Sequence, residues 1–238
     1  MPKSFDAWTV LPHTPIEKLE DNLWRVEGTL PNMPLKRVMA IAKLANGDLV
    51  VHNPIALDAA EMKAIDGFGR VAFLVVPNGW HRMDLKAFAG RYPEAKVLAP
   101  SGSRAQVGEV HAVTGDLSDV AESSGVSLFD LDGTRGKELV MRVVSHGRST
   151  LVFGDAIFCM PHLGGVQGFV LRHLTHSSGT TPHVSRVARW MLLKDKPAFA
   201  AHLERLATPE LARVIVAHHQ TISERPADAL RAVAAEVR

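Results

Sequence analysis

The chain alternates short apolar runs with amphipathic segments, and this pattern predicts an ordered series of strands and helices. Apolar runs of strand length, bounded by polar or turn residues, predict strands over residues 23–28, 37–44, 48–54, 71–77, 95–100, 126–131, 138–145, 149–158 and 213–219. Hydrophobic residues at helical spacing predict helices over 58–69, 85–93, 187–193, 196–207 and 226–237. Residues 101–125 are rich in small residues and predict loops with short strands.

The turn and capping signals indicate how these elements connect. Asn46-Gly47 predicts a tight turn, so the second and third strands should form an antiparallel hairpin. Asp58 suits a helix N-cap and Pro226 suits a first helical turn. Further along, strands alternate with helices, which favours parallel pairing with helices packed on the sheet. We expect an α/β fold in which residues 1–238 form one domain with two sheet halves, each covered by helices.

Composition narrows the class of protein without naming an activity. The chain has 238 residues, of which 46% are hydrophobic and 22% charged, as in a soluble globular protein. It has no run long enough to span a bilayer and no secretory signal at its start, so we expect a cytoplasmic protein with no membrane partner. Lys and Arg number 27 against 25 Asp and Glu, and no basic stripe occurs, so nucleic acid is not an expected partner.

Histidine or aspartate residues lie at or just beyond the carboxyl ends of several predicted strands. They are His52, His81, His146, Asp155, His218 and His219. In open α/β sheets, ligands bind beyond the carboxyl ends of the strands, so these side chains can converge on one cleft. Neutral imidazole and carboxylate are zinc ligands, and three protein ligands plus one water make a catalytic zinc site. A single histidine at a strand end is more often structural, and only the set as a whole indicates a metal site.

The strand order and the strand-end residues together resemble the metallo-β-lactamase superfamily. The resemblance rests on the opening hairpins, on residues 74–100, on LVFGDAIF at 151–158 and on VIVAHH at 214–219. It implies a four-layer αββα sandwich with a metal site in the cleft between the sheet edges. It also implies that Asp155 corresponds to the aspartate that closes a Gly-Asp strand end, and that His218 or His219 corresponds to the last histidine.

The His-x-His-x-Asp-His motif of that family is mostly absent from the turn VVPNGWHRMD at 75–84. If RYPEAKVLAP at 91–100 sets the register, the last motif histidine is His81, and Val76, Asn78 and Trp80 take the other three positions. A shift of three residues instead places His81 at the second histidine and Asp84 at the last. The middle histidine matches His146, at a spacing from Asp155 that is shorter than usual.

The chain is also similar to a less-characterised bacterial and plant branch of the superfamily. The matching segments are VHNPIALD, PNGWH and SHGRSTLVFGD. This branch supplies no activity to carry over.

Two functions follow from the turn at 75–84. In the first, one divalent metal, zinc before iron or manganese, is bound by some of His81, Asp155 and His218 or His219, with His146 or Asp84 as a fourth ligand. The protein would then hydrolyse an ester, thioester, lactone or phosphoester of a small molecule, with Asp155 and His81 as catalytic groups. In the second, the protein holds no metal and binds a small ligand or a partner without catalysis, in a pocket lined by His52, Asn78 and Trp80.

Three further features compete with this site or extend it. His173, His176 and His183 form a rival histidine group, in a segment more typical of a flexible flap over the cleft. The single cysteine, Cys159, excludes an internal disulfide and is expected to be a small buried residue. The amphipathic segment around Trp190 and Met191 favours core packing, with a homodimer surface as the alternative.

Overall fold

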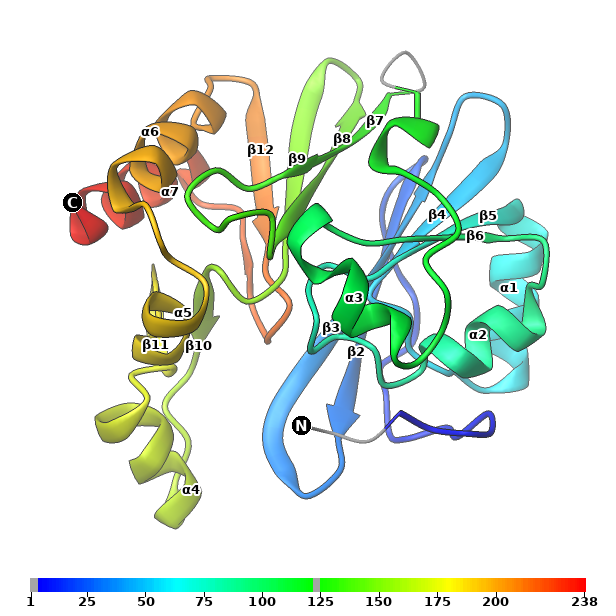
Figure 1. Cartoon of the computed structure of the whole chain (residues 1–238), viewed down its shortest axis with the longest axis horizontal. Coiled ribbons are helices and arrows are strands. Elements are labelled where there is room, and N and C mark those ends of the chain that lie inside the picture. Colours follow the sequence, from blue (N-terminus) through cyan, green and yellow to red (C-terminus); the bar gives the residue numbers. More distant parts are fainter. Residues whose placement is uncertain (1–3, 122–124) are drawn as a thin grey trace.

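The computed structural model describes residues 4–121 and 125–238, in which two β-sheets lie face to face between layers of helices (Figure 1). The first sheet has the order β1-β2-β3-β4-β5-β6, with antiparallel pairs up to β4 and parallel pairs from β4 to β6. Its strands are β1 (Glu17–Glu20), β2 (Leu23–Leu30), β3 (Met33–Lys43), β4 (Asp48–His52), β5 (Arg70–Val75) and β6 (Lys96–Leu98).

The second sheet has the order β13-β12-β9-β8-β7, and only the central β12–β9 pair is parallel. Its strands are β7 (Val126–Asp130), β8 (Leu139–Ser145), β9 (Arg148–Phe153), β12 (Leu211–Ile215) and β13 (Thr221–Ile222). A separate two-stranded ribbon pairs β10 (Phe158–Met160) with β11 (Gly179–His183).

Three hydrophobic clusters show that the elements form four layers. One cluster lies between the sheets, where Val50 and Val75 of the first sheet meet Met141 and Val152 of the second. A second joins the outer face of the first sheet to α1 (Ala59–Phe68) and α2 (Leu85–Arg91). The third joins the outer face of the second sheet to α6 (Lys196–Leu206) and α7 (Pro226–Val237). This arrangement is the predicted αββα sandwich, and Figure 1 shows the two helical layers on opposite sides.

The capping signals are confirmed. The Asp58 side chain accepts hydrogen bonds from the backbone N–H groups of Ala60 and Glu61, at the start of α1. Pro226 opens α7, also as predicted. Asp195, which the sequence analysis did not name, caps α6 through the N–H of Ala198. These polar contacts satisfy helix-end donors, so the helices begin where the sequence predicts.

The predicted short strands within residues 101–125 are wrong for the part that the structure describes. Residues 101–121 form a turn of 3-10 helix, η1 (Ser101–Ser103), the short α3 (Arg104–Gly108) and a second 3-10 turn, η2 (Leu117–Asp119), while 122–124 lie outside the described residues. The predicted strand 149–158 is interrupted after Phe153, and its last residue begins β10.

The segment after β10 also contains elements that the sequence did not predict. They are α4 (Gly165–Phe169), a turn of π-helix, η4 (Val170–Leu174), and the strand β11. The next helix, α5 (Arg186–Met191), confirms the helix predicted over 187–193. No helix in the described ranges combines the length and hydrophobicity needed to cross a bilayer.

Backbone hydrogen bonds join a strand of each sheet to the residues that follow a strand of the other sheet. The N–H of Val38 donates to the carbonyl oxygen of Ala217 at 2.8 Å, and the N–H of Leu139 donates to that of Pro77 at 3.0 Å. Asn78 and Glu138 form an isolated antiparallel bridge beside the second contact. The N–H of Ala217 also donates to the carbonyl oxygen of Gly154 at 3.4 Å, so the segments that follow β5, β9 and β12 are held together at one edge of the sandwich.

Candidate metal centre

Strand register brings Asp155 and His218 together at that edge. Val152 of β9 pairs with Ile215 of the parallel strand β12. Asp155 and His218 each lie three residues beyond this pair. Because parallel strands end at the same edge, equal offsets place the two side chains side by side.

The centre of the site is one carboxylate oxygen that faces two imidazoles. Asp155 Oδ1 lies 2.9 Å from Nε2 of His218 and 3.0 Å from Nε2 of His81, which comes from the loop between β5 and α2. All three side chains are largely buried. The three groups thus present one oxygen and two nitrogens to a common point.

Neighbouring groups hold these side chains in position. His218 Nδ1 lies 2.5 Å from the carbonyl oxygen of Lys36, which can only accept a hydrogen bond, so Nδ1 carries the proton. The Asn78 side-chain amide donates to Asp155 Oδ2 at 3.0 Å, which leaves Oδ1 directed at the imidazoles. In metal sites, hydrogen bonds from neighbouring residues orient the ligand side chains in this way.

The donor set fits a single divalent cation. The candidate ligand atoms of His81, Asp155 and His218 lie within 4.8 Å of one another. Ligand atoms of a tetrahedral zinc site lie about 3.3 Å apart, given bonds of about 2.0–2.1 Å, so small movements of the observed groups would suffice. Two histidines with one carboxylate also suit iron(II). The cluster can therefore hold a metal ion, and its composition does not select which one.

Asp155 and His218 stabilise each other's charged forms. Burial by itself raises the pKa of Asp155, but the charge of His81 and the hydrogen bonds from both histidines outweigh it, so the pKa falls below its usual range. Burial lowers the pKa of His218, and the hydrogen bond to Asp155 reverses this, so the net shift is upward. Asp155 is therefore an anion, which is the form of a carboxylate that binds metal, whereas a histidine binds metal through a ring nitrogen that carries no proton.

A second buried carboxyl group, Glu138, lies behind Asp155 and was missed by the sequence analysis. Extending the β8–β9 register places it opposite Asp155, and it accepts hydrogen bonds from Asn78 Nδ2 at 2.9 Å and from the N–H of Ala156 at 3.1 Å. Burial, and then the negative charge of Asp155, raise the pKa of Glu138 to about 8. A carboxyl group directly before the buried apolar residues Leu139–Met141 of β8 was the available signal.

Replacing Glu138 with glutamine should change how stability depends on pH. The folded protein keeps this carboxyl protonated up to a pKa of about 8, whereas the unfolded chain loses the proton near its ordinary pKa of 4.5. Stability therefore falls as pH rises between these values, on the order of a few kcal/mol for a shift of this size. Urea unfolding from pH 5 to 9 should show a smaller fall for Glu138→Gln.

A pH-independent loss of about 1 kcal/mol is also expected in Glu138→Gln, since an amide cannot accept both hydrogen bonds. The exposed Glu94→Gln is the matched control and should keep the wild-type slope. Equal slopes in all three proteins would show that Glu138 is ionised in the folded state.

A small apolar pocket opens onto the cluster. Its volume is about 180 Å³, below the range of about 300–1,000 Å³ common for drug-sized ligands. It is lined by Leu30, Met33, Leu35, Arg37, Asn53, Trp80, His81, Met83, Asp155 and His218. Of the three lining residues predicted from sequence, Trp80 lines this pocket. Asn78 and His52 do not, because both side chains are fully buried behind it.

Comparisons with solved structures agree with this architecture. The chain aligns with DIM-1 metallo-β-lactamase over 96% of its length and 100% of that chain, with a TM-score of 0.63 and 12% identity. It aligns with a metallo-β-lactamase from Erythrobacter litoralis over 93% of its length and 96% of that chain, with a TM-score of 0.61 and 12% identity. The chain has the metallo-β-lactamase fold. No family model matches the sequence, and no curated protein matches it.

Three residues predicted as metal ligands lie outside the candidate metal centre of this metallo-β-lactamase fold. His146 occupies the exposed β8–β9 turn beside Asp21, at the end of β9 opposite Asp155 and about 20 Å away along the strand. Asp84 is buried in an ion pair with Arg37. His219 has a positive φ of 69°, which turns its ring away from that of His218, and its Nε2 accepts the N–H of Lys36.

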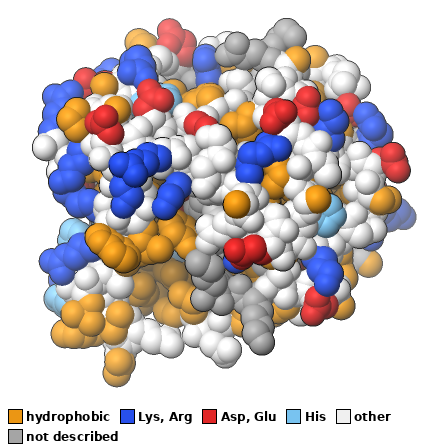
Figure 2. Space-filling view, viewed as in Figure 1, with side chains coloured by type: hydrophobic (Ala, Val, Ile, Leu, Met, Phe, Trp, Pro, Cys, Tyr) orange, Lys and Arg blue, Asp and Glu red, His pale blue; other side chains and the backbone are white. Residues whose placement is uncertain are grey.

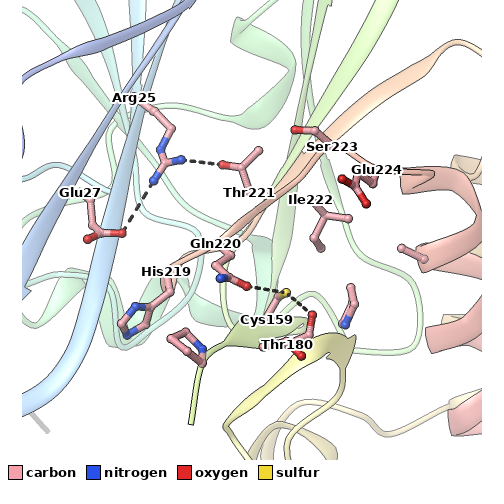
Figure 3. Close-up of a pocket in the computed structure, with 13 residues that line it drawn as sticks. Arg25, Glu27, Cys159, Thr180, His219, Gln220, Thr221, Ile222, Ser223 and Glu224 are labelled. Carbon is pink, nitrogen blue, oxygen red and sulfur yellow. Dashed lines mark hydrogen bonds and ion pairs between the residues drawn. The ribbon is translucent and has the colours of Figure 1, made fainter. Parts of the chain in front are cut away.

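The ring of His219 faces a larger cleft of about 700 Å³, shown in Figure 3. Arg25 in this cleft is held by Thr221 at 2.8 Å and by Glu27 at 3.8 Å. The Cys159 thiol donates to the carbonyl oxygen of Thr180 at 3.3 Å, and burial raises its pKa. A protonated thiol is a poor nucleophile. The smaller pocket, with its converging donors, is therefore the candidate site.

The rival histidines do not join the cluster. His183 is buried on β11, and its two ring nitrogens face the carbonyl oxygens of Thr181 and His176 at 2.8 and 2.9 Å. His173 lies on η4, and its ring is tilted by 41° against that of Phe169, with the ring centroids 4.7 Å apart. Cys159 is buried, as predicted.

Proposed function

We propose that the protein is a metal-dependent hydrolase with a mononuclear centre of His81, Asp155 and His218. The observation that carries this proposal is the approach of two imidazole Nε2 atoms to one carboxylate oxygen. Zinc is the proposed ion, because neutral imidazole and carboxylate are its usual ligands. The proposed substrates are esters, thioesters, lactones or phosphoesters of small molecules.

The residues of the chain divide the work of such a reaction. A divalent cation bound here would supply Lewis acidity and make a water nucleophile available near neutral pH. Trp80, Leu35 and Met83 bind the apolar part of a substrate and exclude water. Asn78 orients Asp155, whose carboxylate accepts the proton of the attacking water and returns it to the leaving group.

Substitution of adjacent histidines tests the proposal. His218→Asn should lose bound metal, whereas His219→Asn should keep it, because only His218 faces Asp155. Asparagine also tolerates the positive φ at position 219, so this control should not strain the backbone. Metal is measured by plasma mass spectrometry on untagged protein produced in medium with zinc, iron and manganese.

A hydrolysis panel of small esters, thioesters, lactones and phosphoesters follows with the metal-loaded protein. Metal-dependent turnover in the wild type and in His219→Asn, but not in His218→Asn, is the expected result. Equal metal content in both variants would exclude the proposed centre, and metal binding without turnover would exclude the hydrolase.

The alternative is a metal-free protein that binds a small ligand. It is favoured by one observation: the Asp155 carboxylate already receives hydrogen bonds from His81, His218 and Asn78, so the cluster is satisfied without an ion. Wild-type protein without bound metal, and with a melting temperature that ignores both zinc and chelator, would favour this function.

A further inference from the structure

An apolar surface projects from one corner of the molecule. Seven large hydrophobic side chains are exposed in the described part of the chain, and five of them fall between residues 166 and 190. They are Val166, Phe169, Leu174, Val187 and Trp190. Trp190 is 77% exposed, so the expectation that it packs in the core is wrong. We call these five side chains the apolar corner.

The elements that carry the apolar corner are held against each other. The Arg186 side chain, at the start of α5, donates to the carbonyl oxygens of His173 and Leu174 at 3.0 and 3.4 Å. The backbone N–H of Arg186 donates to Thr175 at 2.9 Å. The end of η4 and the start of α5 are therefore held together, and Figure 1 shows α4 and α5 at the lower left of the molecule.

The chain segment that carries the apolar corner has charged residues of one sign only. The stretch 156–194 contains no Asp or Glu, although a stretch of this length would hold about four at the average frequency of the chain. It contains four cations, Arg172, Arg186, Arg189 and Lys194. Arg189 forms an ion pair with Glu236 of α7 at 2.6 Å, so the segment keeps three cations without an acidic partner in the described residues. Figure 2 shows hydrophobic side chains gathered over this corner at the lower left, with basic side chains and no acidic ones among them in this view.

We infer that the apolar corner binds the surface of an anionic lipid bilayer. Segments that lie in the membrane interface combine exposed Trp, Phe, Leu and Val with Lys and Arg, and the apolar corner has this composition. The anionic leaflet attracts such cations with about 1 kcal/mol each near the surface. The sequence predicted no membrane partner because the chain has no segment that could span a bilayer. Binding to the membrane surface needs no such segment.

A second copy of the chain is the rival occupant of this surface. The homodimer predicted from Trp190 and Met191 would bring two patches of the same sign together, since a symmetric interface repeats the same surface on both subunits. Like charges facing each other across an interface oppose association. The charge of the corner thus favours the bilayer over self-association.

Co-sedimentation with vesicles tests the inference. The full-length protein is mixed with vesicles of phosphatidylcholine alone or of phosphatidylcholine with phosphatidylglycerol, and the bound fraction is measured at low and high salt. Wild-type protein should bind the anionic vesicles and not the neutral ones, and high salt should weaken the binding. The double variant Phe169→Ser with Trp190→Ser should bind about tenfold more weakly or worse.

Charge and location are tested by three single variants. Arg172→Glu reverses one charge and should also weaken binding about tenfold. Val10→Ser and Lys63→Glu change an exposed hydrophobic residue and an exposed lysine elsewhere, and should bind as the wild type does. All substituted residues are exposed, so circular dichroism should show native folding.

The inference would be overturned if the wild type bound neither kind of vesicle, or if all variants bound equally well. A dimer in light scattering that the Phe169 and Trp190 substitutions dissociate, without vesicle binding, would assign the surface to a second copy instead. Neither result depends on whether the proposed centre holds metal.

Discussion

Replacing Asp155 with asparagine should lower the affinity for a divalent cation by more than about a hundredfold. Loss of a residue that only orients a ligand costs about 10–100-fold, and Asp155 provides both an oxygen ligand and the single negative charge facing the two imidazoles. Asparagine keeps the size of the side chain, so the packing around Phe158, whose ring stacks on His218, should be unchanged. Competition with a chromogenic chelator gives the affinity directly.

The other buried aspartate provides the control for this experiment. Asp84 was also predicted as a ligand, and it pairs with Arg37 instead of joining the cluster. Asp84→Asn should therefore keep wild-type affinity, provided that unfolding curves show both variants to be folded at the assay temperature. Wild-type affinity in Asp155→Asn would show that any bound ion lies elsewhere, and the metal-free function would then account better for the cluster.

The layered fold was predictable because its signals are local. Two helix starts, at Asp58 and Pro226, and one turn, at Asn46-Gly47, were predicted. Each depends only on neighbouring residues, and all three appear in the structure. The alternation of apolar strands with helices then favours only a few packings. The predicted strands within 101–125 failed because small residues carry little periodicity, and the chain there forms short helical turns instead.

One topological rule explains both the success and the failure at the site. Polar residues after the carboxyl ends of strands converge when the strands are parallel, as β9 and β12 are, and this brought Asp155 to His218. Strand β8 is antiparallel to β9, so its carboxyl end lies at the opposite edge, where His146 pairs with Asp21. For the same reason β8 contributes to the site through the residue before it, Glu138. Strand direction was the information missing from the sequence pattern.

The choice between His218 and His219 was likewise a property of the backbone. Adjacent side chains on an extended strand point to opposite faces, and here the strand has already ended. The positive φ of His219 turns its side chain toward the larger cleft, while His218 stays directed at Asp155. A single sequence does not encode which of two neighbouring histidines takes the left-handed conformation, because histidine tolerates it in either position.

Replacing Arg37 with leucine should destabilise the protein by about 3–5 kcal/mol at pH 7, the cost of leaving a buried charge without its partner. The Arg37 and Asp84 side chains are 4% and 0% exposed, and burial raises the pKa of Asp84 while the guanidinium opposes this. Without Arg37 the carboxyl would be buried unpaired. The double variant Arg37→Leu with Asp84→Leu removes both charges and should recover most of the loss, since apolar residues can replace a buried pair at little cost.

Urea unfolding of the wild type, the two single leucine variants and the double variant completes a cycle that isolates the pair. The coupling should exceed about 2 kcal/mol, and the deficit of Arg37→Leu should shrink toward acidic pH, where Asp84 becomes neutral. Additive single effects would mean that the two groups do not stabilise each other. Because Arg37 also lines the pocket beside His81 and Asp155, a strong coupling would show that a buried ion pair in the pocket wall stabilises the fold.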